Sequence, residues 1–173
     1  MALEEVGSLL IRMTIGLLFL ISAFVCGKNV GARKAAAADT ALVFPWRPDL
    51  FTLAGIVIMA AGGLSVLLGI FPRLGAFALT LFLIPAAMIH FRKAREAASL
   101  TKRIVAGLGG KSSGATRKNV AELSDSAVIG NFTSALKNLT LMAPTLYLAL
   151  AGSEPILIGF GPDGHWQGLL TRL

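Results

Sequence analysis

Four polar residues in this sequence lie at the ends of long uncharged segments, where a membrane protein could bind a polar head group. They are Lys28, Trp46, His90 and Asn138. An ammonium, an indole N–H, an imidazole and an amide can each hydrogen bond to the head group of a quinone or a lipid. The simpler interpretation is that these residues cap helices and contact lipid head groups at the membrane boundary. The sequence leaves both interpretations open.

No group of residues predicts a catalytic centre or a metal site. The two histidines, His90 and His165, are expected on opposite sides of a membrane, which excludes a haem with two histidine ligands. No Ser/His/Asp order fits a hydrolase, and no phosphate-binding glycine loop precedes a helix. The single cysteine, Cys26, excludes an internal disulfide and a C-x-x-C redox motif. We therefore expect no catalytic residues and no metal.

Charged residues are also expected at the opposite end of the molecule. Arg12 lies about a turn and a half inside the first uncharged segment, where an arginine is costly unless it is paired or reaches the membrane boundary. Glu154, at the end of the last segment, is the best available partner, and Arg73 is expected in the same layer. We expect an ion pair that fixes the first helix to the fourth, in preference to a catalytic role.

Four helices must position these residues. The apolar segments cover residues 6–27, 50–71, 74–91 and 132–153. About 20 apolar residues in a helix cross the hydrocarbon core of a bilayer, so the segments predict an all-α bundle of four transmembrane helices in a single membrane domain. A cleavable signal peptide is the alternative for the first segment, but Glu4 and Glu5 stand where such a peptide has basic residues.

Glycines recur at seven-residue spacing in the second segment. Gly55, Gly62 and Gly69 therefore fall on one stripe of a helix. Small residues allow a second membrane helix to approach closely. We interpret the stripe as a packing surface.

The composition supports a membrane protein. The 173 residues are 55 % hydrophobic and 14 % charged, and the mean hydropathy is +0.74. The net charge of +7 comes from basic residues that concentrate in the segments between helices, so it indicates contact with anionic lipids and not with nucleic acid.

The basic residues also predict orientation. Residues 28–49, interpreted as a loop, and residues 92–137 together hold thirteen of the sixteen Lys and Arg. The positive-inside rule then places both segments in the cytoplasm and both termini on the non-cytoplasmic side, in a bacterial inner membrane or its equivalent.

Residues 92–130 carry eight Lys or Arg against three acidic residues, with a glycine-rich joint at residues 107–114. Because Leu100 and Ile104 recur on one helical face, one interpretation is an amphipathic helix that lies on the membrane surface or on a partner. The other is a solvated helix that continues the third span.

Several short motifs resemble the DoxX family of small membrane proteins. They are R-x-x-x-G-L-L-F-L from Arg12 to Leu20, G-I-F-P-R-L from Gly69 to Leu74, I-H-F from Ile89 to Phe91 and K-N-L-T-L from Lys137 to Leu141. The resemblance covers nearly the whole chain except residues 92–130. It implies a four-helix membrane protein associated with terminal quinol oxidase or thiosulfate:quinone oxidoreductase complexes.

On this basis we expect an accessory subunit, without catalytic residues of its own, in a larger and quinone-linked membrane complex. Its partners are then membrane lipids and other integral membrane subunits, and a quinone or a lipid is the bound molecule to expect. One alternative is a subunit that itself binds quinone, as in thiosulfate:quinone oxidoreductase. Another is a free-standing protein that handles lipids or small solutes.

Overall fold

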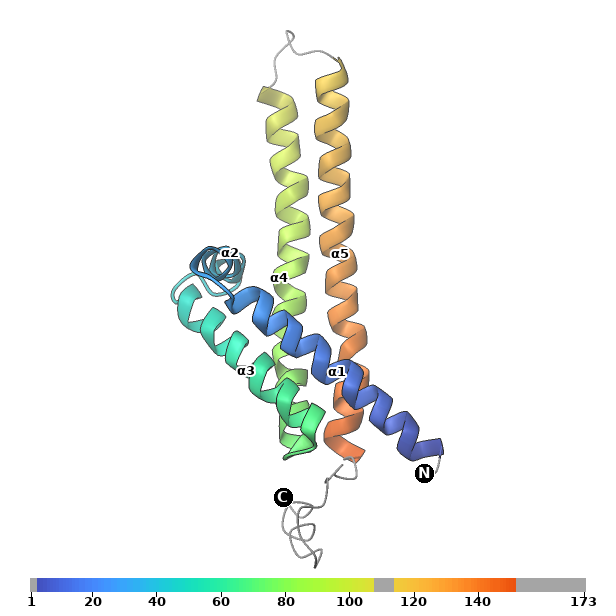
Figure 1. Ribbon diagram of the computed structural model, residues 1–173. Helices are drawn as coiled ribbons and strands as arrows, with labels where there is room; N and C mark the ends of the chain where they lie inside the picture. The colour runs from blue at the N-terminus through green and yellow to red at the C-terminus, as the bar shows by residue number, and fades with distance from the viewer. Residues whose placement is uncertain (1–2, 108–113, 152–173) are drawn as a thin grey trace, which may run out of the picture.

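The computed structural model describes residues 3–107 and 114–151, which form five helices and no strands (Figure 1). In chain order they are α1 (Leu3–Gly27), α2 (Val30–Ala41), α3 (Pro48–Leu68), α4 (Pro72–Gly107) and α5 (Gly114–Ala151). The prediction of an all-α fold is confirmed. Glu154 and His165 lie outside the described residues.

Three helices are long and apolar enough to cross a membrane, which supports the prediction of a membrane protein. They are α1 over Val6–Gly27, α3 and α4. The apolar half of α5 includes Lys137 and Asn138, and α5 does not reach the same apolarity. The structure therefore supports three of the four predicted spans.

The core of the bundle lies where α1, α3, α4 and α5 meet. Its buried side chains include Phe19 of α1, Val66 of α3, Leu83 of α4 and Leu148 of α5. The rings of Phe19 and Phe82 meet edge to face, with centroids 6.3 Å apart. Many other large apolar side chains of the same helices face outward, as expected for helices surrounded by lipid.

Glycines determine how closely α3 approaches its neighbours. A Cβ added to Gly62 would lie 2.9 Å from Leu79 Cγ and 3.1 Å from the carbonyl oxygen of Gly75, so α3 and α4 cross with their backbones almost in contact. On the same stripe, a Cβ on Gly55 would lie 3.0 Å from the ring of Phe82. Gly69 has a different role, because it ends α3 with a φ of 74° in the left-handed region that favours glycine.

A second face of α3, about 100° around the helix from the first, packs against α1 in the same way. A Cβ added to Gly16 would lie 2.7 Å from Leu67 Cβ and 2.9 Å from the carbonyl oxygen of Gly63. This crossing places α1 and α3 at an angle to the long α4–α5 pair (Figure 1). Two adjacent glycines, Gly62 and Gly63, thus serve two different neighbours.

The segment 28–49 differs from its interpretation as a loop, because it contains α2. Asn29 caps the helix by accepting a hydrogen bond from the Ala32 amide at 2.8 Å. Four consecutive alanines, residues 35–38, then favour helix strongly. The two basic residues before the alanines and Asp39 after them make the segment polar, which concealed its helical propensity.

The basic segment 92–130 forms the outer part of a helical hairpin. α4 is unbroken from Pro72 to Gly107, which favours the interpretation that residues 92–107 continue the third span over the interpretation as a separate helix on the membrane surface. We call residues 92–107 and 114–130 the distal hairpin. With a rise of 1.5 Å per residue, residues 92–107 extend about 24 Å past the predicted span.

The two long helices keep one antiparallel register along their common length. The hydroxyl of Thr80 donates to that of Thr145 at 2.9 Å in the buried part of the pair. Farther along, the hydroxyl of Thr101 donates to that of Ser124. The step along α4 from the first pair to the second equals the step back along α5, so the helices pack without a shift between the apolar and the basic regions.

Candidate functional site

His90 is the predicted site residue with the best-defined environment. Its Nδ1 lies 3.4 Å from Oδ1 of Asn131, where the apolar part of α4 ends. The Asn131 amide nitrogen donates to the carbonyl of Ala127 at 2.8 Å, which leaves Oδ1 to accept. A hydrogen on Nδ1 of His90 would complete this contact, and Nε2 is the second polar atom of the ring.

The other three predicted residues differ in exposure and lie on different parts of the fold. Lys28 follows the end of α1 and is exposed. Trp46 is 70 % exposed and packs its ring edge to face against Phe51, 5.2 Å between centroids. Asn138 is half-buried on α5. No hydrogen bond or ion pair joins any two of these four residues in the part of the chain that the structure describes, so a shared site stays a prediction.

A pocket lies between α2 and α3. Its α2 side consists of Val30, Arg33 and Lys34. Its α3 side consists of Asp49, Thr52, Leu53 and Ile56. The sequence analysis did not single out these residues. The sequence feature that could have indicated this pocket is the pair of adjacent cations, Arg33 and Lys34. It indicates a pocket only if residues 30–41 form a helix that faces α3.

Several contacts hold α2 in place. The hydroxyl of Thr52 donates to that of Thr40 at 2.9 Å, and both residues are buried. Lys93 of α4 forms an ion pair with Asp39 at 2.7 Å. Arg92 donates to the carbonyl of Leu42, just past the end of α2. The first residues of the distal hairpin therefore fix α2 against the bundle.

Arg12 lies in the core, where its side chain is only 1 % exposed. Its Nε donates to the carbonyl of Val66 at 3.0 Å. This carbonyl lies in the last turn of α3, where the amides of Gly69 and Ile70 both bond to Ser65 instead, at 3.0 and 3.1 Å. Arg12 thus satisfies a carbonyl that the end of α3 leaves open.

Arg73 acts similarly at the end of another helix. Its Nη2 donates to the carbonyl of Ala151 at 3.3 Å, at the C-terminal end of α5. A cation there is favoured by the helix dipole. The ion pair between Arg12 and Glu154 stays a prediction, because Glu154 lies outside the described residues.

The described residues contain no cluster of three His, Cys, Asp or Glu side chains that could hold a metal ion. Comparisons with family models, with curated proteins and with solved structures found no match to this chain.

Proposed function

We propose that this chain is a DoxX-like accessory subunit of a larger, quinone-linked membrane complex, and that the distal hairpin binds a partner subunit. In this proposal α5 is the fourth span. Support for that span comes from its buried contacts with α4, including Thr145 and Leu148. The proposed association with a quinone-linked complex rests on the resemblance to DoxX proteins. The proposed accessory role rests on the surface of the distal hairpin.

The observation that carries the accessory role is the surface of the distal hairpin. Large apolar side chains are exposed there beyond the apolar spans: Leu123 is 73 % and Ile129 is 65 % exposed, and Leu100 is also exposed. Exposed apolar side chains away from lipid favour a protein contact. The excess of Lys and Arg around them favours an acidic partner surface.

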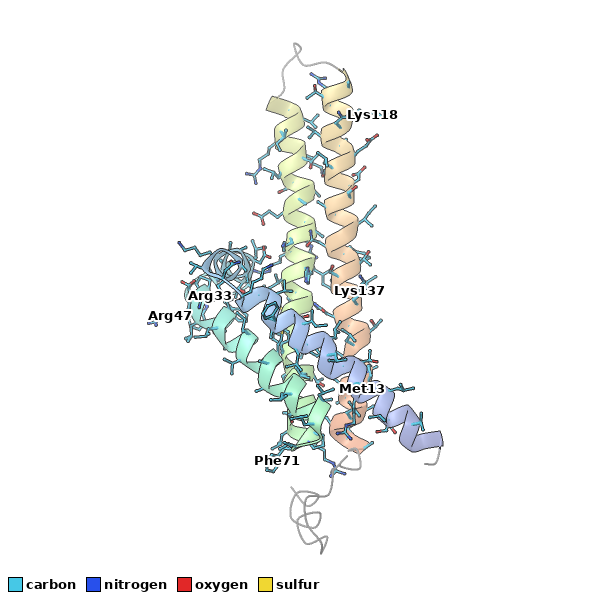
Figure 2. All side chains as sticks on the ribbon, in the orientation of Figure 1. Met13, Arg33, Arg47, Phe71, Lys118 and Lys137 are labelled. Carbon is cyan, nitrogen blue, oxygen red and sulfur yellow. The ribbon has the colours of Figure 1, made fainter. Side chains whose placement is uncertain are left out.

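The membrane orientation can be tested at the two ends of the α4–α5 pair. Figure 2 places Lys118 near one end of the α4–α5 pair and Phe71 at the other. In a Cys26→Ser background, we expect Lys118→Cys to react with an impermeant maleimide only from the cytoplasmic side and Arg73→Cys only from the other side. Labelling of both cysteines from the same side would contradict the proposed spans.

Deleting the distal half of the hairpin tests the proposed partner contact. The register of the pair places Ala98 beside Ala127, so removal of residues 99–126 and joining by a short Gly/Ser linker ends both helices at one level. We expect the variant to insert and fold, because the Thr80–Thr145 and His90–Asn131 contacts remain. Its recovery with partner subunits, measured by quantitative mass spectrometry of gently solubilised native membranes, should fall at least about tenfold.

A site-specific crosslink tests the same partner contact without a deletion. A photoreactive amino acid at Leu123 should crosslink to one partner subunit, whereas the same group at Leu10, an outward residue of α1, should not. Full retention of partners after the deletion would show that they bind through helix faces in the membrane.

The second candidate function is quinone binding by the chain itself. The observation that favours it is the His90–Asn131 pair, which engages Nδ1 of His90 and leaves Nε2 for a hydrogen bond with a quinone or quinol head group. Loss of quinone-dependent electron flow from a deletion variant that keeps its partners would favour this candidate. His90 and Asn138 would then be the residues to replace.

A further inference from the structure

The pocket between α2 and α3 combines cationic and apolar walls at a single place in the fold. Arg33 and Lys34 are exposed on its α2 side, and neither side chain has a hydrogen bond or an ion pair within residues 3–107 and 114–151. The acidic residue nearest to them on α2, Asp39, is instead bound to Lys93 of α4. Two positive charges are thus available at the pocket.

Asp49, the acidic residue that lines the pocket, does not cancel the charges of Arg33 and Lys34. Asp49 lies in the first turn of α3, where the N-terminal end of the helix favours a carboxylate. Its charge is therefore partly balanced by the helix itself. The pocket keeps a net positive charge, which fits one anionic group such as a phosphodiester.

The walls of the pocket change from polar to apolar along α3. The helix begins at Pro48, and the polar residues Asp49 and Thr52 come first, while Leu53 and Ile56 lie about 8 and 12 Å from its start along the axis. α1 ends at Gly27 on the same side, so two of the three apolar helices reach the membrane boundary here. Figure 2 also shows Arg33, Arg47 and Lys137 at a similar height along the long hairpin.

The pocket is also preformed. The hydrogen bond from Thr52 to Thr40 joins its two sides, and Arg92 and Lys93 hold α2 from the third side. Preorganisation of this kind lowers the entropic cost of binding.

From these observations we propose that the α2–α3 pocket binds one anionic phospholipid, phosphatidylglycerol. Its phosphate lies between Arg33 and Lys34, and a head-group hydroxyl donates to the Asp49 carboxylate. One acyl chain lies against Leu53 and Ile56. This site is independent of the partner contact at the distal hairpin.

The test measures the thermal unfolding of the full-length protein in detergent with added lipid. At saturating concentration, phosphatidylglycerol should raise the unfolding midpoint by about 5 °C, and phosphatidylcholine should raise it by less than about 1 °C. In the double variant Arg33→Gln/Lys34→Gln, the phosphatidylglycerol shift should fall below about 1 °C. Both side chains are exposed, so the lipid-free midpoint should stay within about 1 °C of the wild type.

The matched control is Lys102→Gln/Arg103→Gln, which removes one lysine and one arginine, adjacent and exposed, from the distal hairpin and should keep the full shift. Equal loss of the shift in both double variants would show a general charge effect and overturn the site. An equal shift from phosphatidylcholine would overturn the requirement for an anionic lipid. An equal shift from inorganic phosphate would overturn the role of Leu53 and Ile56 as an acyl-chain wall.

Discussion

Replacing Gly16 with leucine is expected to separate α1 from α3 and to lower the stability of the protein substantially. Even a Cβ at this position would lie 2.7 Å from Leu67 Cβ and 2.9 Å from the backbone oxygen of Gly63, and a backbone atom cannot move aside as a side-chain end can. Overpacking of a well-packed core costs about 1–3 kcal/mol, and we expect the upper end of this range here. The unfolding midpoint in detergent should fall by about 6–12 °C.

The same helix offers a matched control. A Cβ added to Gly7 would have no atom within 4 Å, so Gly7→Leu makes the same chemical change without a close contact. Its midpoint should stay within about 2 °C of the wild type. If the two variants lose the same stability, the α1–α3 crossing is not as close as described.

Replacing Arg12 with alanine is expected to have the other large effect. The substitution removes one of the largest fully buried side chains and leaves the Val66 carbonyl without its donor. Large-to-small changes in a core cost about 2–5 kcal/mol, and an unsatisfied buried carbonyl adds about 1–3 kcal/mol. We expect a loss of at least about 3 kcal/mol, measured by unfolding in detergent.

Arg73→Ala is the control for this prediction. Arg73 also donates to a carbonyl at the end of a helix, but the contact is exposed and longer, 3.3 Å. Its removal should cost less than about 1 kcal/mol, since water can replace the donor. A result in which Arg12→Ala costs no more than Arg73→Ala would show that burial of the Arg12 side chain adds nothing to stability.

The sequence predicted the apolar helices well because their signal is local. Long runs without charge require only composition and length to be recognised, and the ends of α1 and α3 fall close to the predicted limits. The packing role of the glycine stripe was predicted in part for the same reason, since Gly55 and Gly62 lie on one face of one helix. Gly69 was predicted to belong to the same packing stripe, but it ends α3, and the end of the helix could not be located from the seven-residue spacing.

The site was harder to predict because it depends on contacts between distant segments. Nothing in the sequence near Asp39 indicates that Lys93 neutralises it, and only this pairing leaves Arg33 and Lys34 available. The spacing of charges along residues 92–107 also did not reveal that the segment stays paired with α5. Lys28, Trp46, His90 and Asn138 share a membrane level by sequence order, but sequence order does not fix their positions around the bundle.

The continuity of α4 has a mechanical consequence. The helix is clamped to α2 by Arg92 and Lys93, with about 21 Å of rod beyond the clamp and about 30 Å before it. The part before the clamp contains Pro85, which removes one backbone hydrogen bond and makes this the more easily bent part of the helix. A sideways pull on the tip would therefore load the contacts of Arg92 and Lys93 with α2 first, and Pro85 separates that load from the crossing where Gly75 meets Gly62.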